Sequence, residues 1–140
     1  MADTFFDELG GMPCLERVHK IFYDKLLDHP WLKGFFEGQD RWVLESQQSD
    51  FMSVLFGGPK IYGGRMPKYA HIHLFVTEEV FLLRHELLGQ SLTEVGILPD
   101  LKERWLKYDM GMKKALVKDS ISECAGRFKS EAVVVVEKPV

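Results

Sequence analysis

The stretch FYDKLLDHPWLKGFFEG, residues 22–38, decides the fold. Its first half continues a pattern that begins near Pro13, with buried-type side chains at i, i+3, i+4, i+7, i+8 and i+11. These positions are Leu15, Val18, His19, Phe22, Tyr23 and Leu26. Pro30 permits a new short turn, and Gly38 ends it. The stretch therefore predicts an amphipathic helix that ends near residue 28, followed by a short aromatic turn.

The residues that follow predict a second long helix and then a loop. Asp40 is a typical N-cap residue, and the inner face of the helix after it carries Leu44, Gln48, Phe51, Met52 and Leu55. Residues 57–67, GGPKIYGGRMP, hold four glycines and two prolines, a composition that predicts a loop. A short helical turn is expected from Pro67 to Leu74.

Two further helices follow. Thr77, with Glu78 and Glu79 behind it, starts a long helix that Gly96 ends. Its expected buried residues are Val80, Phe81, Leu83, Leu87, Leu88, Leu92 and Val95. Pro99 opens a last helix, whose inward positions are Leu101, Trp105, Tyr108, Met112 and Leu116. We expect one all-α domain of five or six helices over residues 1–120.

Residues 121–140 break the helical pattern. Val133–Val136 have high strand propensity, but no partner strand is recognisable elsewhere in the chain. We treat this part as a C-terminal extension of unknown structure. It is expected to be frayed, bound to a partner, or packed in a way that the sequence does not reveal.

Composition excludes several functional classes. The 140 residues carry a net charge of −3 with both signs interspersed, which argues against a nucleic-acid partner. No segment is long and apolar enough for a membrane span, and the acidic N-terminus is unlike a secretory signal. Cys14 and Cys124 have no metal-binding spacing, so we expect free thiols and a cytoplasmic location.

Polar residues on apolar faces are candidates for chemistry. His19 and Tyr23 share one such face and Gln48 interrupts another. Burying them is costly without a partner, although a buried tyrosine often bonds a backbone carbonyl and a glutamine often lies at a solvent boundary. Each therefore needs support from a second observation.

The pair His71 and His73 follows the glycine-rich loop directly. Two residues apart on a helix, they point in different directions, and no third ligand completes a zinc set. An iron held in an organic macrocycle needs only one protein ligand. No nucleophile elbow, phosphate loop, dinucleotide fingerprint or zinc-protease motif is present.

Several segments together resemble the truncated haemoglobins. They are FFDELGG (5–11), the stretch 22–38, FGGPKIYGG (56–64), residues 71–77 and Gly96, which occur in the family's order and at similar spacing. The resemblance covers roughly residues 4–120. It implies a two-over-two helical sandwich around haem b and its iron, in a shortened globin whose first helix is nearly absent.

The resemblance also assigns roles to individual residues. His71 matches the proximal iron ligand, with His73 as an alternative, and Tyr23 matches the distal tyrosine. On the helix that crosses the distal side, Gln47 and Gln48 are expected near the bound gas. The further expected haem contacts are Phe36, Leu44, Met52, Tyr62, Phe81 and Arg84. This distal set is most like group I, but the subgroup assignment is complicated by Arg84. Arg84 is expected to reach a haem propionate, enter the distal pocket or extend to solvent.

The function implied is reversible binding of O2, and of NO or CO, by a monomer or weak dimer. In such a site, Tyr23 and Gln48 would stabilise partial negative charge on the bound gas. The alternatives are a nitric oxide dioxygenase or peroxidase-like enzyme served by a separate reductase, and a gas sensor. In the sensor, His19, His85 or the C-terminal extension would supply a sixth ligand or a partner surface. A haem-free helical bundle is the remaining possibility.

Overall fold

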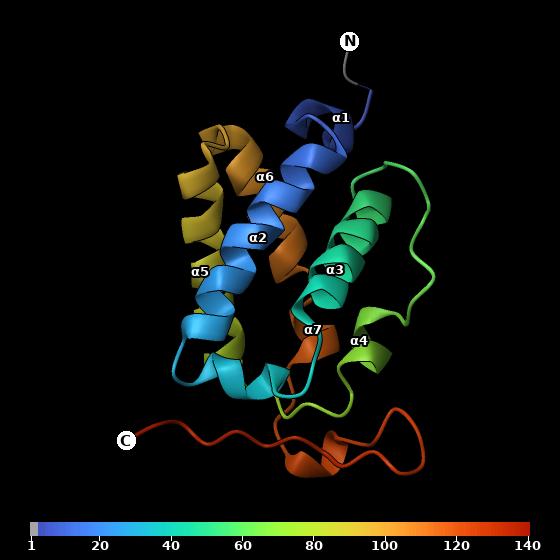
Figure 1. The fold of residues 1–140 in the computed structure, drawn as a ribbon, viewed down its shortest axis with the longest axis vertical. Coiled ribbons are helices and arrows are strands. Elements are labelled where there is room, and N and C mark those ends of the chain that lie inside the picture. Colours follow the sequence, from blue (N-terminus) through green and yellow to red (C-terminus); the bar gives the residue numbers. More distant parts are fainter. Residues whose placement is uncertain (1–2) are drawn as a thin grey trace.

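The computed structural model describes residues 3–140, and helices are the regular elements of this part of the chain (Figure 1). The elements are α1 (Phe5–Leu9), α2 (Met12–Asp28), the 3-10 helix η1 (Leu32–Phe36), α3 (Arg41–Leu55), α4 (Pro67–Ala70), α5 (Glu78–Val95), α6 (Pro99–Met110), α7 (Lys113–Leu116) and the 3-10 helix η2 (Ile121–Glu123). The all-α prediction is confirmed. Residues 3–140 form more α-helices than the five or six expected, because the single turns α4 and α7 count as separate helices.

The four long helices form two layers. In Figure 1, α2 and α3 form one pair and α5 and α6 the other, and α2 packs against both α3 and α5. This is the expected two-over-two arrangement. Leu15, Phe81, Leu92 and Trp105 are at most 1% exposed and lie in the core between the layers. Burial of such large apolar side chains is the main force that holds the layers together.

The helix ends follow the capping residues predicted from the sequence. The Asp40 carboxylate accepts hydrogen bonds from the backbone N–H groups of Trp42 and Val43 at the start of α3. Thr77 accepts one from the Val80 N–H at the start of α5, and Gly96 ends that helix with φ of +90°. A left-handed conformation of this kind favours glycine.

Four local expectations were wrong. Leu55 is 36% exposed, and Ser49 and Ser53 take buried positions on α3 instead. Tyr108, expected to face inward, is 37% exposed. The last helix is interrupted at Gly111, a weak helix former, so that α7 starts afresh at Lys113. The short turn after the loop ends at Ala70 rather than at Leu74.

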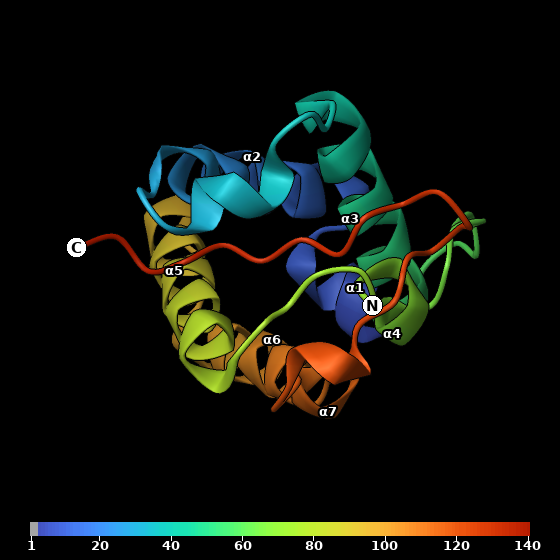
Figure 2. The same ribbon diagram turned by 90° about the horizontal axis from the view of Figure 1, so that it is seen from below.

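The C-terminal segment, residues 118–140, packs on the helices. It crosses the lower end of the helical body, as Figure 2 shows from below. Val134 forms an isolated parallel bridge with Leu74, and the Trp31 indole N–H donates to the Val136 carbonyl at 3.0 Å. For residues 121–140 the sequence left open fraying, a partner, or packing of unknown kind, and the structure shows them packed on the helices. Val134 pairs with the irregular stretch 73–75. Because that stretch has no strand pattern, the sequence could not predict the pairing.

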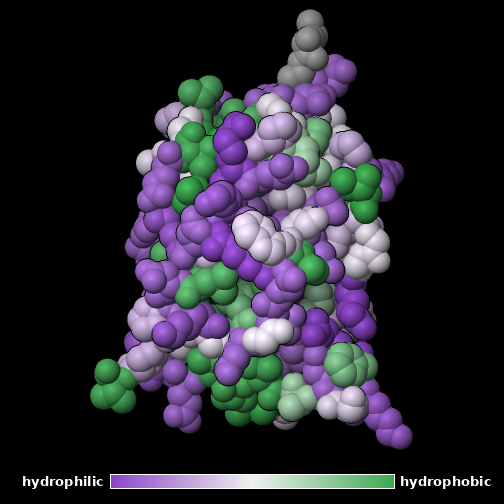
Figure 3. Space-filling view, in the orientation of Figure 1, coloured by the Kyte–Doolittle hydropathy of each residue, from purple (hydrophilic) through white to green (hydrophobic). Residues whose placement is uncertain are grey.

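Polar side chains cover most of the face seen in Figure 3, where apolar groups appear in separate small clusters. Within residues 3–140, no helix combines the length and apolar character that crossing a membrane requires.

Candidate functional site

A cavity of about 200 Å³ lies between the helical layers. Its walls come from α2, η1, α3, the 62–76 stretch, α5, α7 and the C-terminal segment. Most of the lining is aromatic or aliphatic, with a few polar groups, which is the usual character of a small-molecule site. The apolar wall includes Phe22, Leu26, Leu32, Phe35, Phe36, Leu44, Phe51, Leu74, Val76, Val80, Met112 and Leu116.

His71 is the C-cap residue of α4 and lines this cavity. Its Nδ1–H donates to the Pro67 carbonyl, with 2.7 Å between Nδ1 and the oxygen. Burial is the main cause that lowers the pKa of His71 to about 4. The imidazole is therefore neutral near pH 7, and its Nε2 is left to bind a ligand. A metal-binding histidine needs this state and this kind of second hydrogen bond.

Tyr23 lines the same cavity from α2. Its side chain is packed edge-on against the rings of Phe22 and Phe36, with centroids 5.9 Å and 5.7 Å away. Burial raises the pKa of Tyr23 to about 12, so the phenol keeps its proton. Its hydroxyl makes no hydrogen bond to any residue that the structure describes. It can therefore donate a hydrogen bond to a molecule in the cavity.

The amide side chains of α3 complete the polar part of this wall. Gln47 and Gln48 both line the cavity, Gln47 as an exposed residue and Gln48 half-buried. Leu44 lies one turn earlier on the same helix and adds an apolar contact. The structure therefore brings together His71, Tyr23 and both glutamines, as the sequence led us to expect.

The expected haem contacts divide into two groups. Phe36, Leu44, Tyr62 and Arg84 line the cavity, and the Tyr62 ring stacks edge-on against Phe51 at 5.3 Å. Met52 and Phe81, in contrast, are absent from the lining and are 1% and 0% exposed. Both belong to the core, because their positions on α3 and α5 face the interior of the bundle.

Arg84 adopts an arrangement that sequence analysis did not anticipate. Its guanidinium makes two hydrogen bonds to the buried carboxylate of Asp109 on α6, at 2.9 and 2.5 Å. It also lies over the rings of Phe22 and Phe81, with its Cζ 5.5 Å and 5.3 Å from the centroids. Arg84 is thus a fixed cation in the cavity wall.

Asp109 anchors this network. The Nδ1 of His85 lies 2.7 Å from its carboxylate, so Asp109 has two basic partners from α5. Burial would raise the pKa of Asp109, but the charge of Arg84 and the hydrogen bonds from His85 and Arg84 lower it to about 2. Because Asp109 is 25 residues from Arg84 in the sequence, no sequence pattern predicted that the two would pair.

Some lining residues were missed by sequence analysis. Arg65 comes from the glycine-rich loop and Arg127 from the C-terminal segment, and no pattern placed either of them here. His73, expected only as an alternative ligand, also lines the cavity, and its buried Nδ1 has no partner among residues 3–140. The position of His73 next to His71 was the one available signal.

His19 is not part of the lining. Its Nδ1 is 2.7 Å from the Ser49 hydroxyl in the contact between α2 and α3, and both side chains are buried. His85 is engaged with Asp109. Neither histidine is therefore placed as an internal sixth ligand in this structure.

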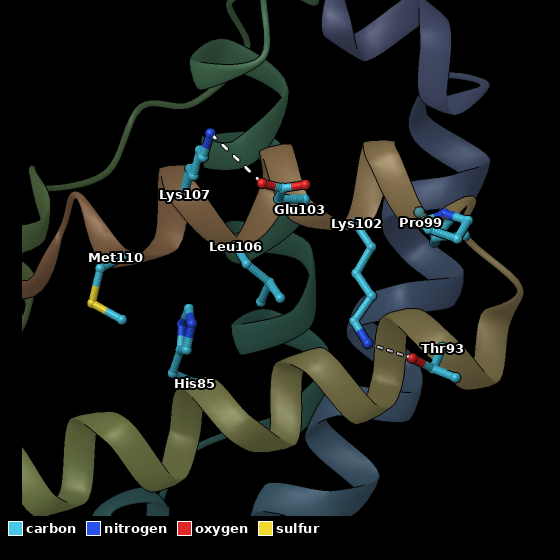
Figure 4. A pocket seen from close by; sticks show the side chains of 9 residues that line it. His85, Thr93, Pro99, Lys102, Glu103, Leu106, Lys107 and Met110 are labelled. Carbon is cyan, nitrogen blue, oxygen red and sulfur yellow. Dashed lines mark hydrogen bonds and ion pairs between the residues drawn. The ribbon is translucent and has the colours of Figure 1, made fainter.

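A second, more open hollow of about 570 Å³ lies between α5 and α6 (Figure 4). Its polar groups are largely paired with one another. Lys102 Nζ donates to the Thr93 hydroxyl at 2.7 Å, and Lys107 forms an ion pair with Glu103 at 3.8 Å. It has no convergent set of unpaired polar groups, so the candidate site is the cavity that contains His71.

The donor set argues for one particular kind of metal site. Among residues 3–140, no three histidine, cysteine or carboxylate side chains gather to hold a metal ion, and both cysteines are free, as expected. A neutral histidine in an apolar, aromatic cavity suits a metal that brings its other ligands in a flat organic ring. The residues present therefore fit a haem.

Comparison with known proteins identifies the family. Residues 4–118 match the family described as bacterial-like globin, and the chain belongs to that family. A group 1 truncated hemoglobin of Tetrahymena pyriformis is 32% identical over 94 residues, which are 67% of this chain and 78% of that protein. One from Nostoc commune is 26% identical over 81% of this chain and 97% of its own.

Solved structures agree with this fold. The Fe(III) form of truncated hemoglobin from Tetrahymena pyriformis has a TM-score of 0.74 at 28% identity, covering 82% of this chain and 98% of that one. The truncated oxygen-avid haemoglobin of Bacillus subtilis, at 21% identity, supports the fold alone, with a TM-score of 0.76 and coverage of 83% and 100%. The protein is a truncated haemoglobin, a haem-binding globin for diatomic gases.

Proposed function

We propose that this globin binds haem b through an iron bond to His71 and holds O2 reversibly, with NO and CO as further ligands. One observation carries the proposal. One cavity contains both a neutral histidine with a free Nε2 and a tyrosine hydroxyl that has no hydrogen-bond partner among residues 3–140. The first is suited to hold the metal and the second to contact a small polar ligand.

Haem b supplies a ferrous iron that binds O2, NO or CO. His71 contributes the protein ligand, and the Pro67 carbonyl fixes both its tautomer and its ring orientation. Phe22, Phe36 and Phe51 form an aromatic wall of the cavity, and we propose that this wall limits the entry of water. Exclusion of water strengthens the hydrogen bonds made inside it.

Tyr23 and Gln48 determine how long a polar ligand stays. Both can donate a hydrogen bond into the cavity, Tyr23 from its hydroxyl and Gln48 from its amide. At about 1–1.5 kcal/mol each, two such bonds would slow the release of O2 roughly 30- to 150-fold. We propose Tyr23 as the main donor because it is the more deeply buried.

The test replaces Tyr23 by phenylalanine and measures O2 dissociation by stopped flow. Loss of one hydrogen bond should speed O2 release about 5- to 13-fold. Release of CO should change less, because CO carries little charge for a donor to stabilise. Tyr69→Phe is the matched control, since Tyr69 is 57% exposed and lies outside the cavity lining. An unchanged O2 release rate in Tyr23→Phe would contradict the distal role.

Nitric oxide dioxygenation would use the same cavity but needs electrons from a separate reductase at each turnover. Mixing the O2 complex with NO separates the two roles. Oxidation of one equivalent without recycling by added reductases fits gas binding, whereas sustained turnover would favour the enzyme.

We also propose a cytoplasmic protein that is a monomer or weak dimer. The free Cys14 and Cys124 support a reducing compartment.

A further inference from the structure

The stretch 71–76, which begins with His71, lies between α4 and α5 and has no regular structure of its own beyond one bridge. Its backbone groups therefore need partners elsewhere. Many of these partners come from the C-terminal segment. The hydrogen bonds are Lys118 N–H to Val76 O at 2.8 Å, Ala125 N–H to Ile72 O at 3.1 Å, Val134 N–H to His73 O at 2.7 Å, and Phe75 N–H to Val134 O at 2.9 Å.

Lys118 adds a side-chain contact to His71 itself. Its residue is 8% exposed, and its Nζ donates to the carbonyls of His71 at 3.0 Å, Leu74 at 2.7 Å and Leu116 at 3.3 Å. An ammonium group in such a place is stable only when hydrogen bonds replace its water. His71 is thus held at two points, its ring by Pro67 and its carbonyl by Lys118.

The far end of the segment is anchored on other elements. The Trp31 indole donates to the Val136 carbonyl, and Lys138 pairs with Glu79 of α5 at 2.7 Å. Within η1, a Cβ added at Gly34 would stand only 2.7 Å from a methyl group of Val136. The segment therefore spans from η1 to α5 across the end of the body (Figure 2). Arg127, earlier in the same segment, also lines the cavity.

We propose that the C-terminal segment is a positioning element for the proximal histidine. Lys118 and Val134 hold the backbone of residues 71–76 so that His71 keeps one orientation toward the cavity. Apart from Lys118, the segment lies outside the part of the chain that matches the globin family. The proposal rests on the ligation of haem iron by His71.

The experiment uses the full-length, haem-loaded protein. Lys118→Met removes the donor to the His71 carbonyl, and Val134→Pro removes the N–H that bonds His73. The matched controls are Lys114→Met, an exposed lysine of α7, and Val135→Pro, whose backbone N–H makes no hydrogen bond to a described residue. Resonance Raman spectra of the ferrous form report the iron–histidine stretching band. Transfer of haem to excess apomyoglobin gives the rate of haem loss.

Both test variants should shift and broaden the iron–histidine band and lose haem at least about tenfold faster, while both controls match the wild type. The band is the decisive readout, because general destabilisation alone would leave its frequency unchanged. If Lys118→Met does not fold, Val134→Pro decides alone.

An unshifted band in Val134→Pro would overturn the proposal, whatever the rate of haem loss. So would equal changes in test and control variants. The absence of an iron–histidine band in the wild type would refute ligation by His71, and this failure is visible before any variant is made.

Discussion

At the residue scale, Asp109 is a buried charge whose loss should affect stability. It is 1% exposed and accepts two hydrogen bonds from Arg84, which is itself mostly buried at 18% side-chain exposure. Two buried opposite charges with good geometry roughly offset their loss of water. Removal of one of them leaves the other without compensation. This asymmetry makes the pair a sensitive point between α5 and α6.

We predict that Asp109→Ala lowers the free energy of unfolding by about 3–5 kcal/mol. Urea unfolding followed by circular dichroism measures this loss. Asp119→Ala, at an exposed aspartate, should stay within about 0.5 kcal/mol of the wild type. The double variant Asp109→Leu/Arg84→Leu should recover much of the stability, since it buries no unpaired charge. If Asp109→Ala lowers the free energy of unfolding by less than about 1 kcal/mol, water hydrates the Arg84 guanidinium in place of the carboxylate, and the prediction is wrong.

At the element scale, His19 and Ser49 form the polar contact between α2 and α3. His19 is 1% exposed and packs edge-on against Trp105, with ring centroids 5.8 Å apart. Burial, with a smaller effect from Arg84, lowers its pKa from 6.5 to about 3. The folded protein therefore keeps this imidazole neutral at pH values where the unfolded chain would protonate it.

Because the unfolded state binds the proton more tightly, this neutral histidine costs nothing above pH 6.5 and destabilises the fold as the pH falls toward 3. We predict that His19→Gln removes a dependence of up to about 1.4 kcal/mol per pH unit in this window. Unfolding free energies of both proteins at several pH values provide the test. Equal slopes for the two proteins would mean that His19 is protonated in the fold.

The elements themselves were largely predictable because their signals are local. Asp40, Thr77 and Gly96 mark helix ends through hydrogen bonds or backbone conformations within a few residues. The inner face of α3 was less predictable. Ser49 and Ser53 are polar by composition, yet they are buried because each finds a hydrogen-bond partner, in His19 and in the Pro59 carbonyl. Such partners are visible only after the helices are packed.

At the scale of the whole molecule, the resemblance to a family placed the principal site residues in one cavity. It could not place Arg127, because the C-terminal segment follows no helical pattern and pairs with the irregular stretch 71–76. It also put Met52 and Phe81 in the cavity, although both lie in the core. Which way a residue on a buried helix faces depends on how the neighbouring helices pack, and a single sequence does not show this packing.

The central claim is that His71 holds the iron of a haem, and the visible absorption spectrum tests it most directly. The wild-type protein should show a Soret band and form O2 and CO complexes in the ferrous state. His71→Ala should lose or greatly alter these spectra, whereas His73→Ala should keep them. An unchanged spectrum in His71→Ala, or an altered one only in His73→Ala, would contradict the assignment. A wild-type protein that takes up no haem would contradict the whole account.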